Sequence, residues 1–425
     1  MRTRCIFIVN SLAITLLLVN AALILSLPRR YAPLPLLAGA CLMTVGLEID
    51  IGVFHFTAIR ILIAAGIVRI ILRGERLAGE INGLDWLMVA WSAWGLASSY
   101  FHKDPSAALV FRLGLVYTNF GIYFLFRVFC ESLDDVERLC RITAIVLLIV
   151  AIEMLFESMT DYNLFSLLGG ISETPTIREG RIRAQGPFDH SILAGTVGAV
   201  CLPLFVGIWK QDLKMTVVGV AACITMIITS ASAGPIMSAV AGIAALVMWN
   251  YRENMRLVRW VVPLGYIGLD MIMKDPAYYI ISRIGLVSGS GGYHRAALIE
   301  SAIQHLDEWW LAGTDYTRHW MPTGVSWSPD HTDITNYYLH MGVVGGLPWM
   351  LLFMAILAKG FSFVGVKIDQ ASDLPDKSRF MLWALGSALF AHAVTAISVS
   401  YFDQSSLFIY LNLAAIGSVW SSETS

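Results

Sequence analysis

Charged residues are scarce in this sequence. Only 14% of its 425 residues are Asp, Glu, Lys or Arg, whereas 57% are hydrophobic, and the mean hydropathy is +0.67. This balance excludes a water-soluble globular protein, which needs far more polar surface for a chain of this length. The six cysteines lie in or at the ends of apolar runs and show no paired spacing. We interpret them as small core residues rather than as disulfides or metal ligands.

Repeats, low-complexity tracts and polar linkers are missing as well. Without a linker, the chain is expected to form a single domain over residues 1–425. A polytopic transporter is the alternative of another class, and it typically shows inverted repeats, broken helices and charges at the membrane midplane. The lack of a repeat argues against a transporter, and the polar residues gather between the apolar runs. We expect no nucleic-acid partner.

Apolar runs fill most of the sequence. A helix of about 20 apolar residues crosses a bilayer, and in lipid only helices or closed barrels satisfy their own backbone hydrogen bonds. The sequence therefore predicts an all-α polytopic membrane protein with about 12–13 transmembrane helices. The first run follows Arg2 and Arg4 and is longer than the apolar part of a usual signal peptide, so we expect an uncleaved anchor. The expected spans are 5–27, 34–49, 56–72, 84–100, 107–129, 142–156, 192–209, 215–230, 235–249, 258–273, 337–358, 380–400 and 405–419.

Two connections between the expected spans are long, residues 157–190 and residues 274–336. If both face away from the cytoplasm, most arginines and lysines of the other connections face it, as the positive-inside rule requires. The 274–336 loop is rich in Trp, Tyr, His and Gly, and we expect short amphipathic helices in it. Arg2 and Arg4 contradict the charge pattern if every run crosses. Either the N-terminus lies outside, or the run 34–49 is re-entrant or lies in the interface, which places both termini in the cytoplasm.

The segment 329–342 is the most informative part of the large loop. It holds two histidines and two aspartates and leads directly into the apolar run at 337–358. His331 is the best candidate for a general base, because histidine titrates near neutral pH and can take a proton from a sugar hydroxyl. Asp330 and Asp333 are expected to orient His331 or raise its pKa. The alternative is a histidine that only forms hydrogen bonds at the membrane interface.

Two further features of the same loop have alternative interpretations. Trp327 can stack on an acceptor sugar, or it can belong to the interfacial belt of aromatic residues found in membrane proteins. A metal site can be assembled from His319, Asp330, His331 and Asp333, but their spacing matches no short ligand motif. We therefore expect no metal ion and no cofactor.

Arginines are the second polar feature of the sequence. Arg178, Arg181 and Arg183 precede a Gly-Pro turn and a new apolar run. Guanidinium groups bind phosphate oxygens in pairs, and the start of a helix attracts anions. The pattern therefore favours a pyrophosphate held at the membrane face. The alternative is that these arginines only contact lipid headgroups.

Arg295 and Arg112 extend this candidate anion site. Arg295 follows a glycine-rich turn at 289–292, where backbone N–H groups can approach an anion, and it precedes an expected amphipathic helix at 296–305. Arg112 lies about one turn inside its expected span, and charged groups inside spans tend to be functional. We expect Arg183 and Arg295 to line one cavity with His331, and Arg112 to reach the same cavity.

Five short segments, taken in their order along the chain, form one further pattern. They are Phe-His-Lys-Asp-Pro at 101–105, Arg-Ala-Gln-Gly-Pro-Phe at 183–188, the Thr-Ser segment at 229–234, the stretch from Arg295 to a glycine turn at 310–313, and the segment from His331 to residue 345. In order and placement they resemble the O-antigen ligase and polymerase family, and the resemblance covers most of the chain. Three features depart from the family pattern. Segment 229–234 lacks an arginine, Thr332 replaces an asparagine, and Asp333 and His340 are additional.

The resemblance implies a membrane glycosyltransferase. Members of the family transfer a glycan from undecaprenyl pyrophosphate at the periplasmic face of the bacterial inner membrane, in an inverting, metal-independent reaction. By resemblance, Arg183, Arg295, Arg112 and Arg181 bind the pyrophosphate, and His331 deprotonates the acceptor hydroxyl. A polymerase extends a lipid-linked glycan of a surface polysaccharide such as O-antigen or exopolysaccharide, whereas a ligase joins the glycan to lipid A core. We predict a polymerase, with a ligase as the alternative.

Overall fold

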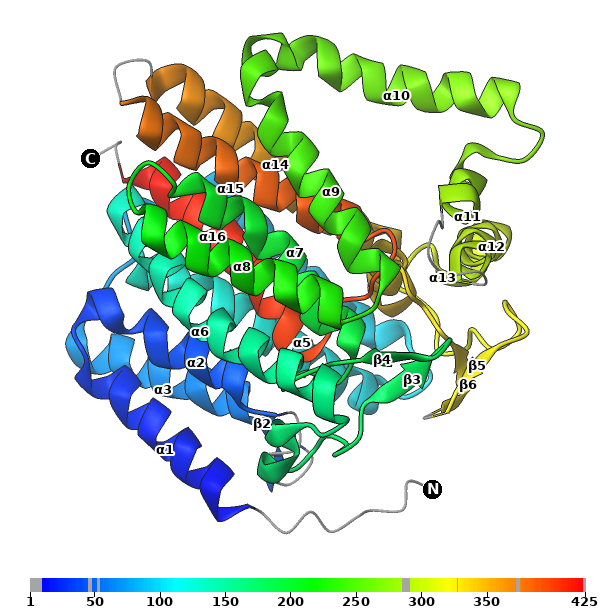
Figure 1. Ribbon diagram of the computed structural model, residues 1–425. Coiled ribbons are helices and arrows are strands. Elements are labelled where there is room, and N and C mark those ends of the chain that lie inside the picture. Colours follow the sequence, from blue (N-terminus) through cyan, green and yellow to red (C-terminus); the bar gives the residue numbers. More distant parts are fainter. Residues whose placement is uncertain are drawn as a thin grey trace.

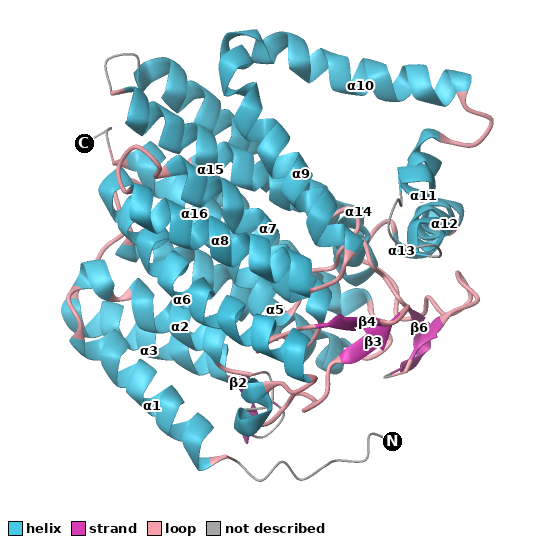
Figure 2. Ribbon diagram, in the orientation of Figure 1, coloured by secondary structure: helices cyan, strands magenta, loops and turns pink. Residues whose placement is uncertain are grey.

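Helices form nearly the whole structure (Figure 1, Figure 2). The computed structural model describes residues 10–44, 48–51, 54–284, 291–326, 328–371 and 375–422. Within these ranges the sheets are antiparallel pairs of short strands, which confirms the predicted all-α class. The pairs are β1 (Glu48–Ile51) with β2 (Phe54–Thr57), β3 (Thr176–Arg178) with β4 (Arg181–Arg183), and β5 (Gly324–Val325) with β6 (Ser328–Thr332).

Each expected apolar run corresponds to a helix, although α2 is shorter than expected and α6 and α14 are longer. In the first half these are α1 (Ser11–Ser26), α2 (Pro33–Leu42), α3 (Ala58–Arg73), α4 (Gly83–Ala97), α5 (Pro105–Phe129), α6 (Leu133–Thr160), α7 (Ser191–Gly207) and α8 (Leu213–Thr229). The second half contributes α9 (Ala233–Val247), α10 (Met255–Ile272), α14 (Tyr337–Gln370), α15 (Asp376–Thr395) and α16 (Ser406–Ser421).

The 274–336 connection folds into short helices, as expected. These are η5 (Ala277–Tyr279), α11 (Ile280–Ile284), α12 (Gly291–Gln304) and α13 (Leu306–Trp309), and the β5–β6 hairpin follows them. Leu298 and Ala302 of α12 pack with Trp309 and with Val343 of α14. The large loop therefore covers the end of the bundle where α14 begins. We call this the loop end, and the opposite end the far end.

Four helical segments in the described ranges are long and apolar enough to cross a membrane. They are Pro105–Phe129, Leu133–Thr160, Ala233–Asn254, which joins α9 to η4 (Met248–Asn254), and Tyr337–Gln370. Helices α1, α7, α8 and α16 are shorter but also apolar. Length and composition thus support a membrane protein, while the count of 12–13 spans stays a prediction.

Polar contacts place the two ends of α1 at opposite ends of the bundle. The Asn10 side-chain amide donates to the carbonyl of Leu167 in η3 (Leu164–Leu168), which follows α6 at the loop end. Just beyond the other end of α1, Arg29 Nε donates to the carbonyl of Val128 near the end of α5 (2.8 Å). The C-terminal end of α16 also lies at the far end (Figure 1). The described chain, which begins at Asn10, therefore starts and finishes at opposite ends of the bundle. Arg2 and Arg4 lie outside the described residues, and the side of each terminus stays a prediction.

α2 is too short to cross a bilayer as a helix. It has 10 residues, which is about 15 Å at 1.5 Å per residue, against a hydrocarbon core of about 30 Å. The helix ends at Leu42, and the Thr44 hydroxyl donates to the carbonyl of Gly169 at the loop end (2.5 Å). Beyond the undescribed residues 45–47 the chain continues in β1. The helical part of the expected run 34–49 is therefore shorter than predicted, although the chain passes from the far end at Arg29 to the loop end at Thr44.

α14 is interrupted at Gly346, where φ is 81° and ψ is 174°. Such a break leaves backbone groups without helical partners, and in a membrane other protein groups must supply them. The Thr314 N–H of the large loop donates to the Val343 carbonyl (2.8 Å). A Cβ at position 346 would lie 2.1 Å from the carbonyl oxygen of Leu311, so only glycine fits. The break is therefore the place where the large loop docks on α14.

α10 lies apart from the other helices (Figure 1). Its main contacts are with η4 and η5, the segments directly before and after it. Its apolar side chains are largely exposed, including Trp260 at 69%, Leu264 at 63% and Ile272 at 84%. A helix with apolar residues exposed in this way is suited to contact with lipid rather than with water.

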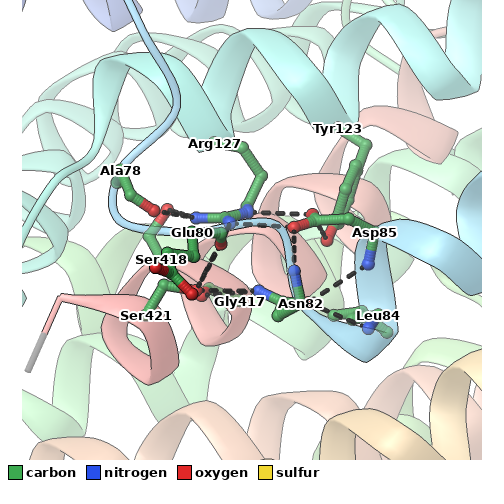
Figure 3. Close-up of polar contacts among 10 residues, drawn as sticks. All are labelled: Ala78, Glu80, Asn82, Leu84, Asp85, Tyr123, Arg127, Gly417, Ser418 and Ser421. Atoms are coloured by element: carbon green, nitrogen blue, oxygen red, sulfur yellow. Dashed lines mark hydrogen bonds and ion pairs between the residues drawn. The ribbon is translucent and has the colours of Figure 1, made fainter. Parts of the chain in front are cut away.

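A buried polar cluster joins the helices at the far end (Figure 3). The Asp85 carboxylate of α4 accepts from Arg127 Nε (3.0 Å) and Nη2 (2.9 Å), and from the Tyr123 hydroxyl (2.7 Å). Arg127 Nη1 also donates to the carbonyl of Ala78 (3.0 Å) and to the hydroxyl of Ser418 in α16 (3.2 Å). The side chains of Arg127 and Asp85 are only 0% and 1% exposed. A fully buried ion pair therefore connects α4, α5 and α16.

Candidate active site

The arginines of the first long connection lie on a β-hairpin that the sequence analysis did not predict. β3 and β4 are antiparallel, with Arg178 opposite Arg181 and Thr176 opposite Arg183. Cross-strand partners share a face of a sheet, and so do alternate residues along a strand. Arg178, Arg181 and Arg183 therefore lie on the same face. The hairpin gathers three positive charges on one surface.

Arg183 and Arg295 both lie near Arg178. Burial, and repulsion from Arg178, lower the pKa of each of these two guanidinium groups. Arg183 Nη2 donates to the hydroxyl of Ser232 at the start of α9 (2.6 Å), and Arg183 Nε is buried with no hydrogen-bond partner in the described part of the chain. Arg295 Nε donates to the carbonyl of Ser398, between α15 and α16 (3.0 Å). The two long connections thus contribute arginines to one cluster.

Two residues next to the first connection hold the chain just after the hairpin. A carboxylate oxygen of Glu157, in the last turn of α6, accepts from the N–H groups of Gln185 (3.0 Å) and Gly186 (2.8 Å). The side-chain amide of Asn163 donates to the carbonyl of Gly186 (2.9 Å). Glu157 and Asn163 are both 0% exposed. They position Arg183 from α6, and the sequence analysis missed both, although a carboxylate in an apolar helix is a known signal of function.

His331 lies in β6 and is half-buried. Its Nδ1 is 2.9 Å from Ser328 Oγ, which also accepts from the N–H of Asp330 (3.2 Å). Burial lowers the pKa of His331 below its ordinary value, although the charges of Asp330 and Asp315 oppose that shift. The imidazole is therefore neutral near pH 7, which is the state that a general base needs. In the tautomer whose Nδ1 donates to Ser328 Oγ, Nε2 carries the basic lone pair.

The carboxylates that act on His331 are only partly those predicted. Asp330 and Asp315 raise the pKa of His331, whereas the charge of Asp333 acts on Arg295. Asp333 thus lies near Arg295, and its orienting role for His331 stays a prediction. The Lys103 N–H lowers the pKa of Asp315, although partial burial opposes this, so Asp315 is ionised. The sequence analysis missed Asp315.

Arg112 belongs to a different, buried network. Its guanidinium donates to the carbonyl of Val344, next to the break in α14, and to that of Ala108 (3.1 Å), and it contacts His102 Nε2. His102 Nδ1 lies 2.6 Å from a carboxylate oxygen of Asp315. At 3% exposure, Arg112 ties the start of α5 to the broken helix and the large loop. We assign it a positioning role, and its contact with pyrophosphate stays a prediction.

The other residues that the sequence analysis named are Arg181, Trp327 and His319. Arg181 is exposed on β4, on the same face as Arg183. Trp327 lies outside the described residues, as do residues 285–290, which include half of the glycine-rich turn at 289–292. His319 is not grouped with His331 and the two aspartates. Its Nε2 is 2.9 Å from a carboxylate oxygen of Glu308 instead.

The chain matches no protein-family model, and no curated protein matches it. The resemblance to the O-antigen ligase and polymerase family therefore stays a prediction from the sequence.

Proposed function

We propose that this protein is a polymerase-type membrane glycosyltransferase. In this proposal, a glycan passes from undecaprenyl pyrophosphate to a sugar hydroxyl at the periplasmic face of the bacterial inner membrane, in the synthesis of a surface polysaccharide. The observation that carries the proposal is a cluster of Arg178, Arg183 and Arg295 at the same end of the bundle as a neutral His331. Displacement of a pyrophosphate by a hydroxyl needs these two elements, cations for the leaving group and a base for the nucleophile.

The arginine cluster suits an anionic leaving group. Like charges opposite one another destabilise a hairpin, and Arg178 has a nearby counter-charge in Glu179, whose carboxylate oxygen is 4.0 Å from Arg178 Nε. A bound pyrophosphate would relieve the repulsion between Arg178 and Arg181, and it would give the buried Nε of Arg183 an acceptor. Negative charge grows on the pyrophosphate as its bond to the sugar breaks. Guanidinium groups therefore stabilise the transition state more than the bound donor, without a divalent cation at this position.

His331 supplies the second element. Its neutral imidazole takes the proton of the acceptor hydroxyl while the hydroxyl oxygen bonds to the anomeric carbon and the bond to pyrophosphate breaks. A single displacement of this kind inverts the anomeric configuration. The carboxylates of Asp330 and Asp315 then stabilise the imidazolium that forms, since both favour the protonated state of His331.

The acceptor separates a polymerase from a ligase. Purified protein is given an undecaprenyl-linked glycan with either a second lipid-linked glycan or lipid A core as the acceptor. Elongation of the lipid-linked glycan would support the polymerase. Transfer to lipid A core alone would assign the protein as a ligase. No transfer to either acceptor would refute the proposed reaction.

We expect the Arg183→Lys variant to lose about 10–100-fold in kcat/KM for glycan transfer. Lysine keeps the charge but cannot form the paired hydrogen bonds of a guanidinium, and each hydrogen bond to a charged group contributes about 1.5–3 kcal/mol. Initial rates of the purified variant at varied donor concentration measure the effect. Arg138→Lys, at the far end in an ion pair with Asp135, is the matched control. Equal activity of the two variants would remove Arg183 from the mechanism.

A cysteine at position 326 tests the predicted side of the large loop. Ser326 is exposed, so a membrane-impermeant maleimide should label Ser326→Cys in cells whose inner membrane is intact. In the same cysteine-free background, Lys214→Cys, exposed at the start of α8, should react only after that membrane is permeabilised. The reverse order of labelling would show that the large loop is cytoplasmic.

A further inference from the structure

Three potential metal ligands meet in the large loop, away from the arginine cluster. They are His305, Glu308 and His319, and one ligand atom from each lies within 4.8 Å of the other two. His319 Nε2 is 2.9 Å from a carboxylate oxygen of Glu308. The side chains of His319 and Glu308 are 36% and 31% exposed, so an ion from solution can reach them. This is the one group of its kind within the described ranges.

His305 and Glu308 each have a second polar partner of the kind that metal ligands use. His305 Nδ1 lies 2.8 Å from the carbonyl of Ser301 and donates to it, so the lone pair of His305 is on Nε2. Trp320 Nε1 donates to the other carboxylate oxygen of Glu308 (3.1 Å). Hydrogen bonds of this type fix the tautomer of a ligating histidine and the orientation of a ligating carboxylate.

Aromatic contacts hold the two imidazole rings. The His319 ring stacks on Tyr316, with centroids 5.0 Å apart and planes at 10°. The His305 ring stacks on Trp320, with centroids 5.6 Å apart and planes at 18°. The two imidazoles are themselves edge to face at 4.9 Å. A tetrahedral zinc ion sets its ligand atoms about 3.4 Å apart, so small rotations of side chains already held in place would suffice.

We infer that His305, Glu308 and His319 bind one Zn²⁺ ion, with water as the fourth ligand. Two imidazoles and a carboxylate form a donor set that zinc favours over magnesium or calcium, which prefer oxygen ligands alone. The inference goes beyond the proposed glycosyl transfer, because none of these residues belongs to the arginine cluster or is the proposed base. It also replaces the predicted absence of a metal ion with a site whose spacing, His-x2-Glu-x10-His, matches no short motif.

The proposed ion supports the strand that carries His331. The N–H groups of Thr317 and Arg318 both donate to the carbonyl of Asp330 in β6, each at 3.0 Å. The N–H of Thr332 donates to Thr317 Oγ1 (3.0 Å). A zinc ion would tie His319, two residues after Thr317, to His305 and Glu308 at the junction of α12 and α13. Its role is therefore structural, and it contacts no reacting atom.

The test is a direct measurement of bound zinc. Full-length protein is purified in detergent, stripped with a chelator, loaded with Zn²⁺ and dialysed, and its zinc is measured by mass spectrometry of the element. We expect about one ion per chain for the wild type. Glu308→Gln and His319→Asn, which keep the size of each side chain, should weaken zinc binding more than about 100-fold, since even an outer partner contributes about 10–100-fold.

Two control measurements accompany the zinc assay, one on a variant outside the site and one on thermal unfolding. His331→Ala should still bind zinc as tightly as the wild type, and loss of zinc in that variant would point instead to a site shared with the proposed base. Zinc should raise the midpoint of thermal unfolding of the wild type but not that of Glu308→Gln or His319→Asn. A cooperative unfolding transition of these two variants without zinc shows that they are folded.

Absence of zinc from the loaded wild type, or full zinc binding by both folded variants, would overturn the inference. These readouts do not depend on glycan transfer. Failure of the zinc site would therefore leave the proposed reaction open, and failure of the reaction would leave the zinc site open.

Discussion

The His331→Ala variant should transfer glycan with a kcat/KM at least about a hundredfold below that of the wild type. General base catalysis typically contributes about 10²–10⁴-fold, and alanine removes the only group that we assign to that role. His331 lies on the five-residue strand β6 and is half-buried, outside the main packed core, so the fold should be kept. The assay measures initial rates of transfer from an undecaprenyl-linked donor by purified protein.

His190→Ala is the control for this prediction. His190 is exposed at the start of α7, with its ring 5.8 Å from that of Phe402, and it has no part in the proposed reaction. We expect its activity to stay within a few-fold of the wild type, because surface substitutions of this kind have small effects. If His331→Ala were as active as His190→Ala, another group would have to be the base.

The pH dependence gives an independent check on the same residue. A base must be neutral to act, and burial holds the pKa of His331 below its ordinary value of about 6.5. Activity should therefore be full at pH 7 and fall only as the pH drops through that lowered pKa. Asp330→Asn removes a charge that raises this pKa, so its acid limb should move to still lower pH. A shift to higher pH in Asp330→Asn would contradict the assignment.

Sequence alone placed the helices well, because the signals that define them are local. The run at 107–129 is apolar, and the Asp104 side chain accepts from the N–H groups of Ser106 and Ala107 at the start of α5, with Pro105 at the first helical position. This is the pattern by which a helix start is recognised in a sequence. The break in α14 also had a local signal, since residues 345–348 include two glycines and a proline. The surrounding run is apolar throughout, and its hydrophobicity alone predicts an unbroken helix.

The geometry of the site was harder to predict, because its contacts join distant parts of the chain. Asp315 is held by His102, which is 213 residues away in sequence, and no spacing rule connects the two. The β3–β4 hairpin did have a local signal. Glu179 and Gly180 have φ of 54° and 73°, and glycine is the usual second residue of such a tight turn, although Asn or Asp rather than Glu usually precedes it. Its strands, Thr-Ile-Arg and Arg-Ile-Arg, alternate polar and apolar residues over only three positions each, which is too short to mark a strand in a sequence.

Replacing Asp85 with alanine should lower the free energy of unfolding by about 3–5 kcal/mol. The substitution leaves Arg127 buried without its carboxylate, and breaking a buried ion pair by removing one partner has a cost of this size. The Tyr123 hydroxyl would lose its acceptor as well. Reversible unfolding of the purified protein in mild detergent, followed with increasing denaturant, measures the change.

A more exposed ion pair at the same end of the bundle gives the reference for the loss of unfolding free energy in Asp85→Ala. Arg138 and Asp135 form an ion pair with side chains 30% and 17% exposed, and Asp135→Ala should cost about 1–2 kcal/mol, because water still solvates Arg138 while the Glu131 N–H just before α6 loses its acceptor. In the double variant Asp85→Leu with Arg127→Leu, no charge is left buried, and stability should recover in part. It should not recover fully, because the carbonyl of Ala78 and the hydroxyl of Ser418 still lose their donor. An Asp85→Ala protein as stable as Asp135→Ala would mean that this ion pair does not hold α4, α5 and α16 together.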